Sequence, residues 1–188
     1  MISTAQKISL VALASFSLLL SGCSSTPSSP VSSYYDMRGL RTDILAENVL
    51  DGGPNEREMI WLNASRLYHE NGRATYYLEV RYAANEETGY LEIYPGRTLN
   101  IVADGQQLRF SGLGSLEQKK DGKVVYEDAR YEASVIDLHT IANARKVTVI
   151  IKGKNSLVTR EFSPENFQRF REFVAQEKLP NTRPHFAQ

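Results

Sequence analysis

Three of the four Asx-Gly dipeptides, each beside alternating apolar and polar residues, constrain the fold of this chain more than any other feature of its sequence. They are Asn71-Gly72, Asp104-Gly105 and Asp121-Gly122. Asn and Asp tolerate a left-handed backbone conformation and Gly adopts one without steric cost, so these pairs favour the tight turns that join antiparallel strands. The chain is therefore expected to contain several β-hairpins.

The segments beside these turns alternate between apolar and polar residues, which is typical of half-buried strands. Ala74–Tyr82 is the clearest case, and Met59–His69 is expected to pair with it across the first turn. The same pattern predicts further strands over Leu99–Ala103, Gln107–Gly112, Lys123–Ile136, Val147–Ile151 and Leu157–Phe162. The alternation also places Glu127 and Asp128 on opposite faces of their strand, so they are not expected to act as a carboxylate pair.

Helical spacing of apolar residues occurs in three places. Arg41–Leu50 is compatible with a short helix, and Asp137–Ala144 interrupts the strand pattern with another. The clearest helix has Ser163 as its N-cap and Pro164 in its first turn, where the missing N–H costs nothing, and Pro180 ends it. Its apolar stripe consists of Phe167, Phe170, Phe173 and Val174. This stripe predicts a helix that covers apolar surface.

Antiparallel strands with one inserted helix and one terminal helix indicate an α+β fold. The architecture is either a single twisted antiparallel sheet or a two-sheet sandwich, with the C-terminal helix packed on the sheet. The expected organisation is a signal peptide over 1–22, a tether over 23–33, one globular domain over 34–180 and a loose tail over 181–188. A domain of this length can bury a core of its own.

The first 23 residues have the parts of a secretory signal that ends in a cysteine. Lys7 is basic, Ile8–Leu20 is an apolar run too short to span a bilayer, and Leu20-Ser21-Gly22-Cys23 closes the segment. This arrangement closely resembles the signal peptide and lipobox of bacterial lipoproteins. The resemblance implies cleavage before Cys23 and a diacylglycerol on its sulfur, and two or three acyl chains make a firm anchor.

The resemblance also implies a location. In Gram-negative lipoproteins, an aspartate after the lipidated cysteine favours retention in the inner membrane, whereas Ser24 stands at that position here. The protein is therefore expected in the inner leaflet of the outer membrane, facing the periplasm, or in the plasma membrane if its source is Gram-positive. Ser24–Ser33 is rich in Ser and Pro and is expected to be a flexible tether. The pattern from Ile141 to Phe167 resembles the ends of other small periplasmic proteins.

Charge and cysteine content exclude several partners and chemistries. Removal of residues 1–22 takes away Lys7 and no acidic residue, which leaves 166 residues with 21 basic and 22 acidic side chains. A nearly neutral domain has no electrostatic reason to bind nucleic acid. Cys23 is the only cysteine, so its lipidation leaves no thiol for a disulfide, a thiolate nucleophile or a cysteine-ligated metal.

No catalytic or metal-binding signature occurs in the sequence. His69, His139 and His185 have none of the spacings of a zinc motif. The chain contains no Gly-x-Ser-x-Gly frame for a serine hydrolase, and Gly112-Leu113-Gly114 is interpreted as a turn between strands rather than as a dinucleotide-binding loop. We therefore expect no enzymatic activity, no metal and no cofactor.

The chain contains ten tyrosines. Tyrosine suits a half-buried sheet and is also enriched at interfaces, so both interpretations stay open. Tyr77, on the polar side of its strand, and Tyr90 and Tyr94, near a Pro-Gly turn, are the candidate binding residues.

Two functions of different class fit these observations. The first is a lipid-anchored, non-catalytic interaction or accessory module that binds an envelope protein through a sheet face or edge. The alternative is a binder of a small cell-wall or lipid ligand in a pocket between sheet and helix. The tether and the lack of site signatures favour the first.

Overall fold

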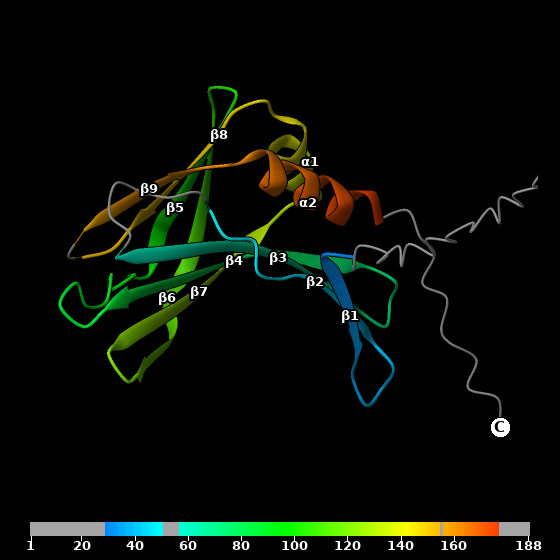
Figure 1. Cartoon of the computed structure of the whole chain (residues 1–188). Coiled ribbons are helices and arrows are strands. Elements are labelled where there is room, and N and C mark those ends of the chain that lie inside the picture. The colour runs from blue at the N-terminus through cyan, green and yellow to red at the C-terminus, as the bar shows by residue number, and fades with distance from the viewer. Residues whose placement is uncertain (1–28, 51–56, 155, 177–188) are drawn as a thin grey trace, which may run out of the picture.

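The computed structural model describes residues 29–50, 57–154 and 156–176. Nine strands and two helices occur within these ranges (Figure 1). They are β1 (Val31–Tyr35), β2 (Arg41–Leu45), β3 (Glu58–Tyr68), β4 (Ala74–Asn85), β5 (Gly96–Ala103), β6 (Gln106–Asp121), β7 (Val124–Ala133), α1 (Val135–Asn143), β8 (Val147–Lys152), β9 (Leu157–Glu161) and α2 (Pro164–Ala175). The expected signal peptide, Cys23 and the tail over 181–188 lie outside the described residues.

All nine strands belong to one antiparallel sheet, in the order β1-β2-β3-β4-β7-β6-β5-β8-β9. The expected α+β class with a mostly antiparallel sheet is confirmed, and the continuous pairing corresponds to the single sheet among the two expected architectures. The sheet is strongly curled (Figure 1). Arg160 of the edge strand β9 reaches Glu58 of β3 at 3.2 Å, although five strands separate β9 from β3 in the sheet order.

The expected hairpins are confirmed, and their turns have the predicted chemistry. The β5–β6 turn places Asp104 at φ 47° and Gly105 at φ 89°, the two left-handed residues of the turn type that matches strand twist. The Asp104 carboxylate also accepts hydrogen bonds from the backbone N–H groups of Arg145 and Lys146, which lower its pKa. In the longer β3–β4 turn only Gly72 of the Asn-Gly pair is left-handed, at φ 77°, and its N–H donates to the carbonyl oxygen of His69 at 3.0 Å.

The core lies on one side of the sheet, which we call the inner face. Alternate strand residues such as Leu62, Leu78 and Val149 are fully buried there. This buried cluster also includes Phe170 and Phe173 of α2 and Ile141 of α1. Its other members from this part of the chain are Leu138, Ala142, Phe162 and Val174. The outer face is polar, with exposed ion pairs such as Arg81–Asp128 at 2.8 Å. Because the large apolar side chains of the core lie on one face, the strands show the alternation on which the prediction rests.

The C-terminal helix begins at the residue that its sequence signals predict, whereas the inserted helix begins earlier. Ser163 caps α2, and Pro164 is the first residue of the helix. Asn166 Oδ1 accepts a hydrogen bond from the backbone N–H of Ser163, which completes a capping box. α1 begins at Val135, two residues earlier than expected, because Ser134 and Asp137 form a second capping box. α2 ends at Ala175, before Pro180, which lies outside the described residues.

Three local predictions are wrong. Arg41–Leu45 forms strand β2 rather than a helix, because it pairs on both sides with β1 and β3. β1 begins at Val31, so the last three residues of the expected tether are in the sheet. Gly112-Leu113-Gly114 is not a turn. It lies inside the long strand β6, where the register with β7 shifts at two bulges between Gly112 and Glu117.

Candidate functional site

The sheet forks where β6 and β7 separate. β6 pairs with β7 from Gly112 to Asp121, whereas residues 106–110 of β6 pair with β5 alone among the described strands. On the other side of the fork, Glu132 and Ala133 of β7 still pair with β4. β7 then ends, because Ser134 takes the extended N-cap conformation of α1 and the chain leaves the sheet.

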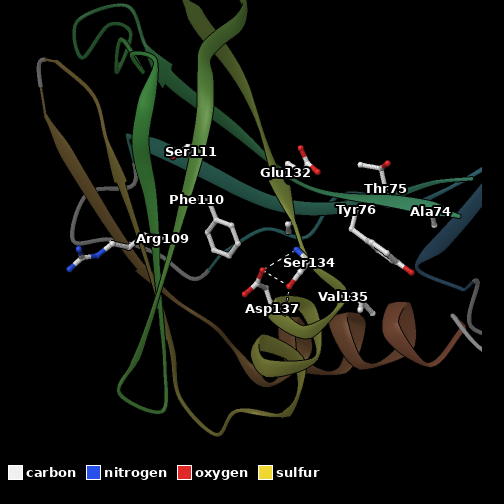
Figure 2. A pocket seen from close by; sticks show the side chains of 11 residues that line it. Ala74, Thr75, Tyr76, Arg109, Phe110, Ser111, Glu132, Ser134, Val135 and Asp137 are labelled. Atoms are coloured by element: carbon white, nitrogen blue, oxygen red, sulfur yellow. Dashed lines mark hydrogen bonds between the residues drawn. The ribbon is translucent and has the colours of Figure 1, made fainter.

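A cavity of about 660 Å³ lies in this fork (Figure 2). It is lined by residues 74–76 of β4, 109–111 of β6 and 132–135 at the junction of β7 and α1, together with Asp137. Its volume falls in the range of small-ligand sites. The recess thus lies between strands of the sheet and the start of α1.

Several polar groups around the fork already have partners within the protein. Ser134 Oγ donates to Asp137 Oδ2 at 2.7 Å, and the backbone N–H groups of both residues complete the capping box. Figure 2 shows Phe110 in the middle of the fork and the Arg109 guanidinium pointing away from it. Arg109 donates instead to Gln107 Oε1 at 2.7 Å. Since ligand sites need convergent polar groups, this bonding makes the fork a polar recess rather than a fully formed ligand site.

Beyond one wall of the fork lies a buried charged cluster, which we call the Asp43 cluster (Ser33, Arg41, Asp43, Arg66 and Tyr68). The Asp43 carboxylate is fully buried on the inner face of β2. It accepts hydrogen bonds from Ser33 Oγ at 2.7 Å, Arg41 Nε at 2.5 Å and Tyr68 OH at 3.2 Å. Arg66 Nε is 3.6 Å from Asp43 Oδ2. Two guanidinium groups thus share one carboxylate.

Arg66 is the least balanced member of the Asp43 cluster. Its side chain is 1% exposed, and only Nη2 is hydrogen-bonded, to the carbonyl oxygen of Phe173 in α2 at 2.9 Å. Nε and Nη1 have no hydrogen-bond partner among the described residues. The rings of Phe173, Tyr68 and Tyr76 lie 5.0, 5.7 and 6.0 Å from its guanidinium carbon, so part of its charge faces aromatic rings. Tyr76 is also the wall between Arg66 and the fork.

A second buried carboxylate, Glu127, has a different environment. It accepts hydrogen bonds from the backbone N–H groups of Glu92 at 3.0 Å and Ile93 at 2.6 Å, and from the Ser115 hydroxyl. These bonds fix the β4–β5 connection to the inner face. Gly114, at φ 89°, allows the close approach, since a Cβ there would lie 3.0 Å from the Ile93 carbonyl oxygen. Glu127 is therefore a structural joint between β7, β6 and the connection.

The predicted tyrosines are spread over both faces of the sheet. Tyr77 lies on the outer face of β4, with the guanidinium carbon of Arg130 5.3 Å from its ring centroid. Tyr90 and Tyr94 lie in the connection that Glu127 fixes to the inner face, with Tyr90 half-buried against the core and Tyr94 exposed. The structure does not bring Tyr77 together with the other two, and a binding role for them stays a prediction.

Among the described residues, the β1–β2 hairpin carries the two most exposed aromatic side chains and the most exposed apolar one, whereas the exposed Leu113 and Ile136 lie elsewhere. Tyr34 and Tyr35 are 59% and 47% exposed, and Met37 at the tip is fully exposed. The tip is well ordered by hydrogen bonds, because Asp36 Oδ1 accepts from the backbone N–H groups of Arg38 and Leu40 at 2.9 and 2.8 Å. These backbone bonds lower the pKa of Asp36, so the carboxylate stays charged. The hairpin thus holds Met37 away from the protein in a defined position.

Sequence reasoning missed both buried carboxylates and this hairpin. Glu127 could have been found, because it shares the inward parity of Val125, Ala129 and Tyr131. Asp43 could not, since its burial depends on the pairing of β2 with two other strands.

Comparison with known proteins does not assign the site. The chain matches no family model, no curated protein and no solved structure. Across the three described ranges, no group of three His, Cys, Asp or Glu side chains is arranged to hold a metal ion. No helix in the same ranges has the length and apolar character needed to cross a membrane.

Proposed function

We propose that this protein is a lipid-anchored envelope lipoprotein whose β-rich domain is a non-catalytic interaction module. The sequence Leu20-Ser21-Gly22-Cys23 supports lipidation of Cys23, and Ser24 supports transfer to the inner leaflet of the outer membrane, or residence in the plasma membrane of a Gram-positive source. β1 begins eight residues after Cys23, so an extended tether places the sheet within ~26 Å of the lipid.

The observation that carries this proposal is the β1–β2 hairpin. β1 is at the end of the strand order, so one of its edges has no partner strand among the described residues. Beside this edge, Tyr34, Tyr35 and Met37 present exposed aromatic and thioether groups, which are the residue types enriched at interfaces. We further infer that α2 packs on the inner face and closes it to a partner. Binding then takes place at the edge and the hairpin.

Site-specific photocrosslinking tests this surface. A photoreactive amino acid replaces Met37 in the full-length lipoprotein, and the matched control carries it at Lys119, which is exposed on β6. After irradiation of intact envelopes, we expect discrete crosslinked bands from position 37 and none from position 119. Equal yields at the two positions, or no product at position 37, would contradict the proposal.

The anchor has its own test. Metabolic labelling with an alkyne fatty acid should label the wild-type protein and leave Cys23→Ala unlabelled. The variant should also leave the membrane fraction. If Cys23→Ala stays with the membranes to the same extent as the wild type, the lipobox assignment fails.

A second function is supported by the cavity of about 660 Å³ in the fork. In this case the domain binds a small cell-wall or lipid ligand between the sheet and α1. Titration of the protein with muropeptides or with short-chain phospholipids, followed by thermal shift, measures such binding. Ser111→Trp fills the fork from β6 and should abolish any stabilisation, whereas Lys119→Trp on the outer surface should not. Stabilisation that survives Ser111→Trp would place the ligand elsewhere.

A further inference from the structure

The two edges of the sheet differ in how they are protected against pairing with another strand. β9 carries Arg160 and Glu161, and Glu161 forms an ion pair with Lys146 at 3.1 Å. Such charges discourage edge-to-edge association. β1 has the sequence Val-Ser-Ser-Tyr-Tyr and contains no charge, proline, glycine or bulge. Its edge therefore lacks the charges, the proline and the bulge that commonly keep a strand from pairing.

We propose that β1 pairs antiparallel with β1 of a second copy of this chain, so that two sheets join into one. This inference rests on the proposed function and names its partner. Pairing of all five residues places Ser33 opposite Ser33 of the second copy, with Ser32 opposite Tyr34 and Val31 opposite Tyr35. Each tyrosine then faces a smaller residue, and no like charges meet. The edge is thus complementary to itself, as a two-fold interface requires.

The position of the anchor favours a second copy over a soluble strand. Each β1 follows its lipidated cysteine by eight residues and is held near the bilayer. A two-fold axis along the membrane normal lets both tethers reach the same leaflet. Confinement to one membrane raises the effective concentration of one β1 for the other. A five-residue strand buries less than the ~1,000 Å² of a stable interface, so the pairing depends on this confinement.

Cysteine crosslinking tests the register. Directly opposed residues in an antiparallel pair have Cα atoms ~4.5–5.5 Å apart, which a disulfide can span. Ser33→Cys in the full-length lipoprotein should give a dimer when membranes are oxidised. Coexpressed Ser32→Cys and Tyr34→Cys chains should also crosslink, and this pair leaves the hydrogen bond from Ser33 to Asp43 intact. Thr159→Cys on the exposed side of β9 is the matched control and should stay monomeric.

Adding positive charge to the β1 edge tests whether the uncharged edge is the reason for pairing. Ser32→Lys with Tyr34→Lys places lysines opposite lysines in the proposed register and should lower the Ser33→Cys dimer yield at least tenfold. Leu157→Lys with Thr159→Lys adds the same charge to β9 and should leave the yield unchanged. Circular dichroism confirms that each variant is folded.

The outcomes separate this inference from the proposed function. If neither the Ser33→Cys chain nor the Ser32→Cys and Tyr34→Cys pair forms a dimer, or if Thr159→Cys dimerises equally well, pairing through β1 is rejected. Photocrosslinks from Met37 to a different protein in that case would retain the interaction module with another partner. Dimers that persist after removal of the lipid anchor would contradict the dependence on membrane confinement.

Discussion

The two fully buried carboxylates of this protein are stabilised in opposite ways. Glu127 receives backbone N–H groups and a hydroxyl, so its charge is met by neutral donors. Asp43 receives two guanidinium groups, and Nε and Nη1 of Arg66 have no hydrogen-bond partner in the described residues. A carboxylate held by backbone donors acts as a fixed joint, whereas a cluster with excess charge is balanced only through several side chains at once.

This difference coincides with position in the sheet. Glu127 lies near the middle of the strand order, where β7 has a partner on each side. Asp43 lies on β2, next to the β1 edge, and Ser33 of β1 contributes to its cluster. The buried charges that lack some of their hydrogen-bond partners thus lie in the same part of the molecule as the proposed interaction surface.

The largest effect is expected from loss of the Asp43 charge. Asp43→Asn leaves Arg41 and Arg66 without a counter-ion in a buried site, which should lower the free energy of unfolding by about 3–5 kcal/mol. Urea unfolding monitored by circular dichroism measures it. Asp128→Asn, in an exposed ion pair with Arg81, is the matched control and should change it by less than ~1 kcal/mol. Similar values for both variants would remove the contrast between buried and exposed charge.

A smaller loss is expected at Glu127. Glu127→Gln keeps one acceptor oxygen but turns an amide toward backbone N–H groups, which should cost about 2–3 kcal/mol. No cation is left unpaired, so the effect stays below that of Asp43→Asn. The same unfolding measurement compares them, and a larger loss for Glu127→Gln would reverse the ranking of the two regions.

Replacing charge by apolar volume should reveal coupling in the Asp43 cluster. Asp43→Leu combined with Arg66→Met removes a buried carboxylate and a buried guanidinium together, so neither of these two charges is left without the other, although Arg41 keeps its charge. We therefore expect the double variant to be more stable than the sum of the single variants predicts, by about 2 kcal/mol. A double-mutant cycle from four urea unfolding curves gives this value. Strict additivity would show that Arg66 is balanced by the rings of Phe173 and Tyr76 rather than by Asp43.

The last expected effect, which is absent at neutral pH, is a pH dependence near Glu127. Burial raises the pKa of Tyr131 from 10.0 to about 12, its hydrogen bond with Thr98 offsets part of this, and Glu127 adds to it. Its folded pKa is higher than its unfolded pKa, so the stability it contributes is complete below pH 10. It is lost as pH rises toward 12, at about 1.4 kcal/mol per pH unit.

Comparison with Tyr131→Phe isolates this term, because the other alkaline titrations are common to both proteins. Unfolding free energies of the two proteins should converge or cross between pH 10 and pH 12, and parallel curves would show that Tyr131 keeps an ordinary pKa. In a Glu127→Gln background, the pKa of Tyr131 should be lower than in the wild type, since one of the groups that raise it has lost its charge.

Local sequence signals were sufficient for the hairpins and for both helices, because their turns and caps depend on neighbouring residues. Asp104-Gly105 and the Ser163-Pro164 start of α2 are examples. β2 was missed because its inward residues are Asp43 and Leu45, so a buried charge interrupts the apolar alternation. The fork could not be predicted, because its position depends on the residue at which β6 stops pairing with β7. The proposed hairpin surface was missed for the same reason as β2.

The placement of β7 has a consequence for the order in which the strands pair during folding. The β3–β4 and β5–β6 hairpins precede β7, which joins them by pairing with β4 on one side and β6 on the other. Pairing of Asn85 with Val124 closes the loop formed by the residues between them, which is much longer than a hairpin turn. The entropic cost of this pairing therefore exceeds the cost of closing either hairpin. The β3–β4 and β5–β6 hairpins therefore remain separate units with exposed edges until β7 pairs with both. Pulsed hydrogen exchange should therefore find that the β5–β6 hairpin is protected first. The amides of β4 that bond to β7 should become protected later, at the same time as β7. Protection of these β4 amides before β7 would contradict this order.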